Sequence, residues 1–247
     1  MKKRLLFRTG AATVVAAALC LAQTAPAPRS RVTITHVKPE MQNEWVDLQK
    51  NEVIPALKKA GVKSRRVSST ALFGNAYEYA IVTPLDKFAD FDAGNPLTRA
   101  LGPERSARLQ EKLRKCVIGT HSFLSTSMPE LSIPRTSQTP PRIVVMTRVR
   151  VAAGKAQEWE SYVKNEILPV YKKGNVTGYT VSRRSLGANL NDRVLSTSYN
   201  SYAELDAGTH LTRLLGAEGA AKVLAKGAGL STVIETIVRS PVADLSF

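Results

Sequence analysis

The sequence predicts an α+β protein built from two copies of one structural unit. The chain contains two tryptophans, Trp45 and Trp159, and shifting the sequence by the 114 residues that separate them aligns it with itself without a gap. Both aligned copies also show the same order of strand-like and helix-like patterns. Because self-similarity at a fixed spacing is the signature of a repeat architecture, we infer a tandem duplication.

Two segments carry the strongest match between the copies. The sequence Asn-Glu-Val-Ile-Pro at 51–55 returns as Asn-Glu-Ile-Leu-Pro at 165–169. The pattern Asp-Ala-Gly-x-x-Leu-Thr-Arg-x-Leu-Gly at 92–102 returns at 206–216. We interpret this second motif as structural, because its first residue, Asp92, can cap a helix and its last glycine can end one.

The duplication also sets the domain boundaries. The copies span 30–132 and 142–246, and the connecting segment 133–141 is rich in proline, serine and threonine. Such a composition is typical of a linker. We therefore expect two repeats joined by a short connector.

Each copy predicts the order strand, helix, strand, strand, helix, strand. In the first copy, alternating β-branched residues predict a strand at 32–37, with its equivalent at 143–151. Apolar residues at helical spacing predict a helix at 41–60, which Pro55 should kink or break near Asn51. The remaining elements are strands at 62–72 and 76–83 with a turn at Gly74-Asn75, an interrupted helix at 84–115 and a last strand at 116–125. This β-α-β-β-α-β order is the ferredoxin-like plan.

One such unit covers one face of its sheet with helices and leaves the other face bare. We expect the bare face to be apolar, and exposing apolar surface costs about 25 cal/mol per Å². A covalent tandem raises the effective concentration of the two sheets to roughly millimolar or more. The sequence therefore predicts two ferredoxin-like units that pair their sheets into a pseudo-dimeric α+β barrel.

The N-terminus predicts export. A basic start at 2–4 precedes an apolar run at 11–22 that is too short to span a bilayer. Small residues at positions 20 and 22 suit a cleavage that leaves Gln23 first. We expect residues 1–22 to be a signal peptide, the protein to be periplasmic or secreted, and no membrane span to remain after cleavage. A lipoprotein anchored at Cys20 and an uncleaved anchor are the alternatives.

Charge and cysteine content narrow the functional class. The formal net charge is +15, but the basic residues are dispersed and lack the aromatic partners of an RNA-binding signature, so we expect no nucleic-acid partner. Loss of a signal peptide would leave Cys116 as the sole cysteine, which excludes an intrachain disulfide. The sequence contains no Gly-rich phosphate loop, no His-Glu-x-x-His and no Gly-x-Ser-x-Gly motif. Nucleotide chemistry, zinc hydrolysis and elbow-type serine catalysis are therefore disfavoured.

The repeated element order, the tryptophan of the first helix and the Asn-Glu-x-x-Pro segment make the chain resemble the dimeric α+β barrel superfamily. It looks most like secreted tandem-repeat members of that superfamily whose activity is uncharacterised. The superfamily includes cofactor-free monooxygenases of polyketide quinones, haem-degrading enzymes and chlorite dismutase-like haem proteins. The resemblance implies a pocket between the first helix and the sheet, but a fold does not fix an activity.

The three histidines are the first candidates for chemistry. His36 and His121 lie on the first and last strands of copy one, which are neighbours in a ferredoxin-like sheet, so they could share a proton-transfer site. Their equivalents Arg150 and Glu235 should then form an ion pair. The alternative is a pair of polar positions on a solvent-facing surface, and we predict no metal site. His210 should begin a helix or occupy a turn; the resemblance allows a haem-ligand role for it, but we predict no cofactor.

The resemblance to barrel proteins supplies the remaining candidates. Asn51 and Tyr79 join His36 and His121 as candidate catalytic residues. The candidate ligand-binding residues come from the first helix and facing strands of both copies: Trp45, Arg65, Tyr77, Trp159, Asn165 and Arg183. We expect an exported protein that binds a small molecule between helices and sheet. The alternatives are a cofactor-independent monooxygenase-like enzyme acting on a small aromatic or quinone-like substrate, and a non-catalytic interaction module.

Overall fold

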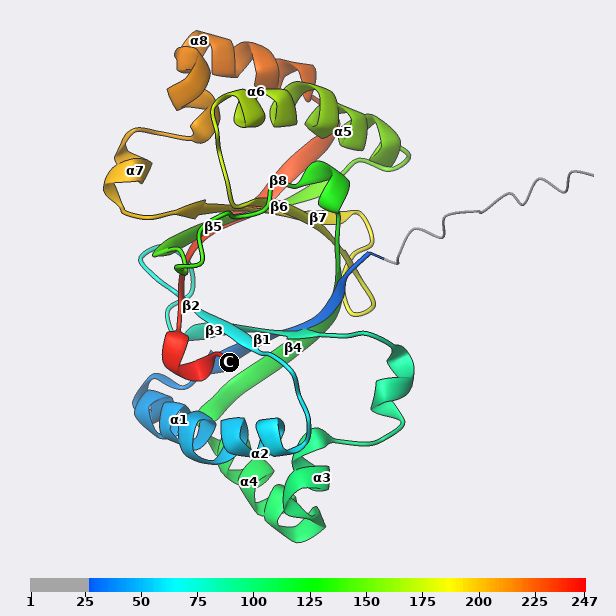
Figure 1. Ribbon diagram of the computed structural model, residues 1–247, viewed down its shortest axis with the longest axis vertical. Coiled ribbons are helices and arrows are strands. Elements are labelled where there is room, and N and C mark those ends of the chain that lie inside the picture. Colours follow the sequence, from blue (N-terminus) through cyan, green and yellow to red (C-terminus); the bar gives the residue numbers. More distant parts are fainter. Residues whose placement is uncertain (1–26) are drawn as a thin grey trace, which may run out of the picture.

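The computed structural model describes residues 27–247, so the expected signal peptide lies outside the described residues. The first half follows the predicted order (Figure 1). Its strands are β1 (Arg29–Val37), β2 (Arg66–Thr70), β3 (Glu78–Pro84) and β4 (Val117–Ser127). Its helical segments are η1 (Pro39–Met41), α1 (Gln42–Leu48), η2 (Gln49–Val53), α2 (Ile54–Lys59), η3 (Phe88–Phe91), α3 (Pro96–Leu101), α4 (Pro103–Cys116) and η4 (Pro129–Leu131).

The second half repeats this arrangement. Its strands are β5 (Ile143–Val151), β6 (Tyr179–Ser185), β7 (Asp192–Tyr199) and β8 (Ser231–Pro241). Its helical segments are α5 (Ala156–Tyr162), η5 (Val163–Ile167), α6 (Leu168–Lys173), α7 (Ala203–Asp206), α8 (His210–Lys226) and η6 (Ala243–Leu245). Because both halves place the first strand between the third and the last, the two ferredoxin-like units are present as predicted.

The two sheets join edge to edge into one closed barrel. The strand order around it is β1-β3-β2-β8-β5-β7-β6-β4, and β4 closes on β1. Strands β2 and β8 form one seam between the halves, and β4 and β6 form the other. Figure 1 shows the barrel in the middle, with the helices of each half packed outside it at opposite ends of the long axis. All eight strands pair with antiparallel neighbours.

The first helix of each half continues through its proline instead of breaking. Helix α1 passes into a π-helical turn, η2, and then into α2, which begins one residue before Pro55. A proline lacks the N–H for the bond to the residue four before it, and its ring presses against that carbonyl, here of Asn51. The wider π turn removes this conflict. The same turn, η5, precedes Pro169 in the second half.

The retained motif is structural, but Asp92 does not cap the helix. The side chain of Asn95 caps α3 by accepting a hydrogen bond from the backbone N–H of Leu97 at 2.9 Å. In the second half Thr209, the residue equivalent to Asn95, caps α8 by accepting a hydrogen bond from the backbone N–H of Thr212 at 3.2 Å. The prediction for Asp92 was therefore wrong by three positions. Gly102 ends α3 at φ 80°, a left-handed conformation that glycine adopts without strain.

Each half has its own hydrophobic core between helices and sheet, and each core contains a residue from the other half. Leu131, at the end of the first repeat, is 1% exposed and packs in the core built around Trp159. Leu245, at the equivalent position of the second repeat, is 0% exposed and packs in the core built around Trp45. The halves are thus interlocked as well as paired.

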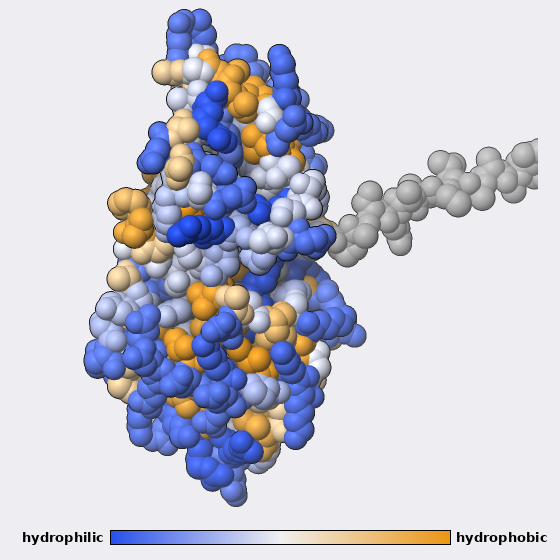
Figure 2. Space-filling model, turned by 60° about the vertical axis from the view of Figure 1, so that its left-hand side comes forward, coloured by the Kyte–Doolittle hydropathy of each residue, from blue (hydrophilic) through white to orange (hydrophobic). Residues whose placement is uncertain are grey.

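The face shown in Figure 2 is largely hydrophilic, with apolar patches over both halves. Among the described helices, none combines the length and the hydrophobicity that a membrane crossing requires.

Candidate functional site

Each strand of the barrel has one face toward the helices and one toward the lumen, because successive side chains of a strand alternate. In β1, Val37 packs in the helix-covered core, so His36 and Ile34 point into the lumen. In β5, Val149 and Val151 pack in the core of the second half, so Arg148 lies on the lumen side. A site can therefore lie in either helix–sheet layer or in the lumen.

The two candidate histidines share the lumen face but do not meet directly. His121 pairs in register with Ile34, and His36 pairs with Gly119, so the histidines are diagonal neighbours. His36 instead contacts Asn75 at 2.8 Å through Nδ1 and Glu78 at 3.4 Å through Nε2. Within residues 27–247, no group of three His, Cys, Asp or Glu residues is arranged to hold a metal ion.

The expected ion pair between Arg150 and Glu235 does not form. Arg150 binds Asp192 on β7 at 2.8 Å, and Glu235 binds Arg148 at 2.7 Å. The prediction was wrong because Arg148, the residue directly opposite Glu235 in the register, takes its carboxylate. The Arg150–Asp192 pair is the counterpart of His36 with Glu78 in the first half.

In the first half, three predicted residues gather between helix and sheet. The rings of Trp45 and Tyr79 lie 4.5 Å apart, and the amide of Gln42 donates to the Tyr79 hydroxyl at 2.8 Å. Arg65 is 3% exposed and donates from Nη2 to Gln49 Oε1 at 2.7 Å. These residues form a tightly packed layer rather than an open pocket.

Arg65 has no carboxylate partner within the described residues, and its Nη1 has no hydrogen-bond acceptor there. Burial lowers its pKa to about 10. The guanidinium nevertheless stays charged at neutral pH, and an unpaired buried charge is costly.

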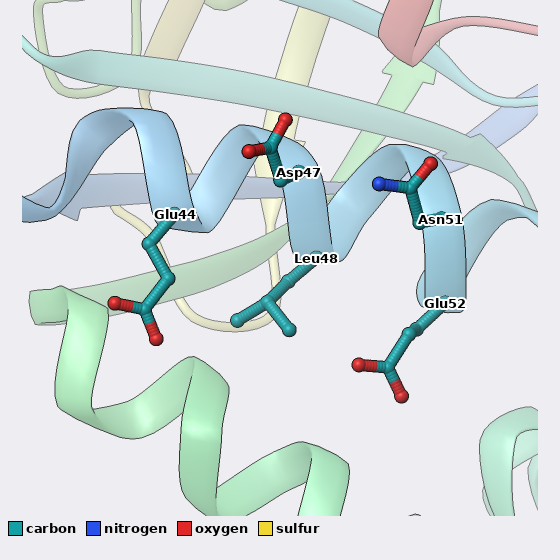
Figure 3. Close-up of a pocket in the computed structure, with 5 residues that line it drawn as sticks. All are labelled: Glu44, Asp47, Leu48, Asn51 and Glu52. Atoms are coloured by element: carbon teal, nitrogen blue, oxygen red, sulfur yellow. The ribbon is translucent and has the colours of Figure 1, made fainter.

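Asn51 lies elsewhere, in an open groove of about 430 Å³ on the outside of α1. In Figure 3, Glu44, Leu48 and Glu52 point from this helix toward the neighbouring helical segment, whereas Asp47 and Asn51 point away from it. Glu52 accepts from Lys112 Nζ on α4 at 3.2 Å. This groove is acidic and solvent-facing, so Asn51 does not join Tyr79 in one site.

The other predicted ligand-binding residues are dispersed. Tyr77 is 40% exposed in the loop before β3, and Asn165 and Arg183 are exposed as well. Trp159 is buried in the second half, in the same core as Tyr171 and Tyr179.

The second half holds a cluster of aromatic rings that the sequence analysis did not identify. His210 stacks on Tyr199 with ring centroids 4.9 Å apart, and the edge of Tyr171 meets it at 5.8 Å. Tyr171 also meets Tyr179 edge-on at 5.0 Å. We call these four residues the Tyr/His cluster; His210 is 6% exposed and Tyr179 is 2% exposed.

The cluster contains two hydrogen-bond donors with no acceptor. Arg213 donates to Nδ1 of His210, and arginine cannot accept, so the neutral imidazole carries its proton on Nε2. Burial, with help from Arg213, lowers the pKa of His210, which keeps the ring neutral near pH 7. His210 Nε2 and Tyr179 Oη are both buried and have no partner within residues 27–247. Burial also raises the pKa of Tyr179, so its hydroxyl stays protonated.

A signal for this cluster was present in the sequence, as a difference between the repeats rather than a shared motif. The positions equivalent to Tyr171, Tyr179, Tyr199 and His210 hold Leu57, Arg65, Leu85 and Pro96. At all four positions the second repeat has a tyrosine or histidine that the first repeat lacks, and the four side chains lie together in the buried layer between helices and sheet. His210 does begin helix α8 as predicted, but its side chain turns into the core.

Haem does not fit His210 as the residues stand. An axial ligand needs a free nitrogen, which Nε2 provides, but Tyr199 covers one face of the imidazole and Tyr171 meets its side. A porphyrin would require these buried rings to move.

Comparison with solved structures supports the architecture. An anthrone oxidase-like protein aligns with 87% of this chain and 92% of its own, at 11% identity and a TM-score of 0.58. A chlorite dismutase from Candidatus Nitrospira defluvii aligns with 90% of this chain and 93% of its own, at 9% identity and a TM-score of 0.55. No protein-family model and no curated protein matches the sequence. The chain therefore has the dimeric α+β barrel fold, with both halves of the barrel supplied by one polypeptide.

Proposed function

We propose that the protein binds a small aromatic molecule with a carbonyl-type oxygen at the Tyr/His cluster of the second half. The observation that supports this is the pair of buried donors, His210 Nε2 and Tyr179 Oη, which lack an acceptor. A buried donor without an acceptor costs about 1–3 kcal/mol. A ligand oxygen or an ordered water would remove that cost.

The surroundings of the donors define the ligand class. Tyr171 and Tyr199 offer flat apolar surfaces, and aromatic rings prefer stacked or edge-on neighbours. Neither donor is charged at neutral pH, so a neutral acceptor such as a quinone or anthrone carbonyl suits the cluster better than a carboxylate. The rings pack closely, so binding requires them to separate.

A second candidate function is cofactor-independent oxidation of such a molecule. Two neutral donors beside an aromatic wall would stabilise the oxyanion of a deprotonated substrate, which is the role of an oxyanion hole. The fold match to an anthrone oxidase-like protein makes anthrone the probe to test. Oxygen uptake on adding anthrone would support oxidation; binding without uptake would restrict the function to ligand binding.

The two tryptophans provide a reporter for each half, since Trp45 lies in one core and Trp159 in the other. In the Trp45→Phe variant, titration with anthrone or anthraquinone should quench the remaining fluorescence of Trp159. Tyr179→Phe and His210→Phe should each weaken binding by roughly tenfold, as the loss of one hydrogen bond predicts. The matched control is Tyr79→Phe, whose hydroxyl bonds Gln42 in the first half. Quenching only in the Trp159→Phe variant would move the site to the first half.

We also propose that the protein is exported to the periplasm or the medium. The support is the basic start followed by a short apolar run within residues 1–22.

A further inference from the structure

The lumen of the barrel is more highly charged than an apolar sheet-to-sheet interface would be. Charged inward-facing residues of the second half include Arg148, Arg184, Arg239, Asp192 and Glu235. The expectation of an apolar shared face was therefore wrong for much of this surface.

The ion pairs of the lumen do not include the guanidinium of Arg184. Asp192 and Glu235 both bind Arg148, at 3.0 and 2.7 Å, and Glu78 binds Arg239. Within residues 27–247, Arg184 makes neither an ion pair nor a side-chain hydrogen bond, and its Nε is buried without a partner.

The surroundings of Arg184 do not fully replace a counter-ion. Its guanidinium lies 4.2 Å from the ring centroid of Phe123, a cation–π contact that gives partial compensation. Burial lowers the pKa of Arg184, and repulsion from Arg148 lowers it further. Glu235 and Asp192 act in the opposite direction, although neither forms an ion pair with Arg184, and Arg239 has the weakest effect, again a lowering one. Arg184 is thus repelled by two neighbouring arginines, and the two carboxylates near it are ion-paired with Arg148 and not with Arg184.

Other unmatched donors face the lumen at the opposite seam of the barrel. Arg239, which is 2% exposed, has partners for neither Nε nor Nη1 among the described residues, and the Thr70 hydroxyl opposite it is also unpartnered. Thr70 and Arg184 are equivalent positions of the two repeats, each at a seam between the halves. These atoms can all donate hydrogen bonds, but Arg239 and Thr70 lie at the other seam from Arg184, so only the Arg184 guanidinium is a candidate for the site described next.

A cavity lies beside Arg184. It measures about 10 Å³, the lower limit for one water-sized particle, so an ion of the size of chloride fits once the lining side chains move slightly apart. Its lining residues are Met146, Arg148, Arg184, Val194, Glu235 and Ile237. The one carboxylate of the lining, Glu235, is already engaged by Arg148.

We propose that this cavity binds a small inorganic anion of about the size of chloride, held by Arg184 and Arg148 inside the barrel. An ion at this point neutralises the unpaired guanidinium. It also links the halves, because Arg184 belongs to the seam strand β6, which pairs with β4 of the other half. This site is separate from the Tyr/His cluster, which lies on the outer face of the same sheet.

The test is thermal unfolding in sodium chloride against sodium gluconate, whose anion is too large for the cavity, at equal ionic strength. Above the dissociation constant, the melting temperature of the wild type should rise by roughly 3–5 °C per tenfold increase in chloride. Arg184→Met should lose this dependence. The matched control is Arg183→Met, one residue earlier in β6 and exposed on the outside of the barrel. Equal melting temperatures in both salts for the wild type would overturn the proposal, as would an Arg184→Met protein that still responds to chloride.

A second measurement does not depend on a folded variant. Crystals of the wild type soaked in sodium bromide should show an anomalous peak within hydrogen-bonding distance of Arg184 Nε. A water molecule at that position, with no anomalous signal, would refute the site even if Arg184→Met failed to fold.

Discussion

Leu131 and Leu245 are related by the 114-residue repeat, and each completes the hydrophobic core of the half to which it does not belong. Both lie in short 3-10 segments, η4 and η6, that follow the last strand of their own repeat. The backbone keeps them in place: Ile133 pairs with Tyr179 of β6, and Phe247 pairs with Arg65 beside β2. This exchange makes each half dependent on the other.

Leu245→Ala should destabilise the protein by about 2–5 kcal/mol, the range for removing a fully buried leucine side chain from a core. Leu131→Ala should cost a similar amount, because its burial is equivalent. Urea unfolding followed by fluorescence checks this prediction. Leu72→Ala, which changes a 65%-exposed leucine, is the control and should change stability by less than about 0.5 kcal/mol. A cost below 1 kcal/mol for Leu245→Ala would show that the exchange is not important for stability.

His210 should make the stability of the fold fall in mild acid. Burial lowers its pKa below the usual value of 6.5, so the unfolded chain binds a proton more readily than the folded one. The stability linked to neutral His210 is present above pH 6.5 and is lost as pH falls toward the folded-state pKa, with a slope of at most about 1.4 kcal/mol per pH unit. Urea unfolding between pH 7 and pH 5 measures the slope. His210→Phe should flatten it. An identical slope in wild type and His210→Phe would contradict the assignment.

Asp192→Asn should cost roughly 3 kcal/mol by removing the carboxylate that Arg148 and Arg150 share. Burial acts to raise the pKa of Asp192, but hydrogen bonds from Arg150 and Arg148 outweigh it, and the pKa lies below 3.8. The stability that Asp192 contributes is therefore present above pH 3.8 and lost as pH falls below it. Chemical unfolding at pH 7 and pH 3 should show a large difference between wild type and variant at pH 7 and a smaller one at pH 3. An equal difference in stability between wild type and variant at both pH values would mean that the effect comes from packing and not from charge.

Export should leave a shortened chain. Intact mass spectrometry of protein recovered from the periplasm or the medium should give an N-terminus between Gln23 and Pro28. Such cleavage leaves the first strand whole, since β1 begins at Arg29. Protein that retains Met1 in that fraction would refute the signal peptide. Replacing the basic residues Lys2, Lys3 and Arg4 with glutamine should reduce the exported amount.

The order of elements could be predicted because each pattern occurs twice. The bounds predicted for β5, Ile143–Val151, are those of the structure. The predicted β1 began three residues too late, at residue 32 and not at Arg29. The reason is tertiary: the carbonyl of Pro28 accepts a bond from Ser127 of β4, which extends the pairing beyond the β-branched run.

The Tyr/His cluster was harder to predict than the fold, because its four residues come from four separate elements. The first half was easier. Trp45 and Tyr79 were found and do meet, since the first helix lies directly over the central strands. Tyr171 and Tyr199 have no local pattern that distinguishes them from core residues. The lumen arginines were missed for another reason. In Thr-Arg-Val-Arg-Val at 147–151, arginines alternate with valines in the way that a solvent-facing strand surface does. Only closure of the barrel turns that surface inward.

The crossed position of the two leucines has a consequence for the order in which the molecule assembles. The core around Trp45 is incomplete without Leu245, which follows Trp45 by 200 residues. The core around Trp159 requires Leu131, which is synthesised earlier. Multidomain chains usually fold one unit at a time as they leave the ribosome or a translocation channel. Here the amino-terminal half stays incomplete until synthesis has passed the second repeat, so the polypeptide reaches its native state as one cooperative event.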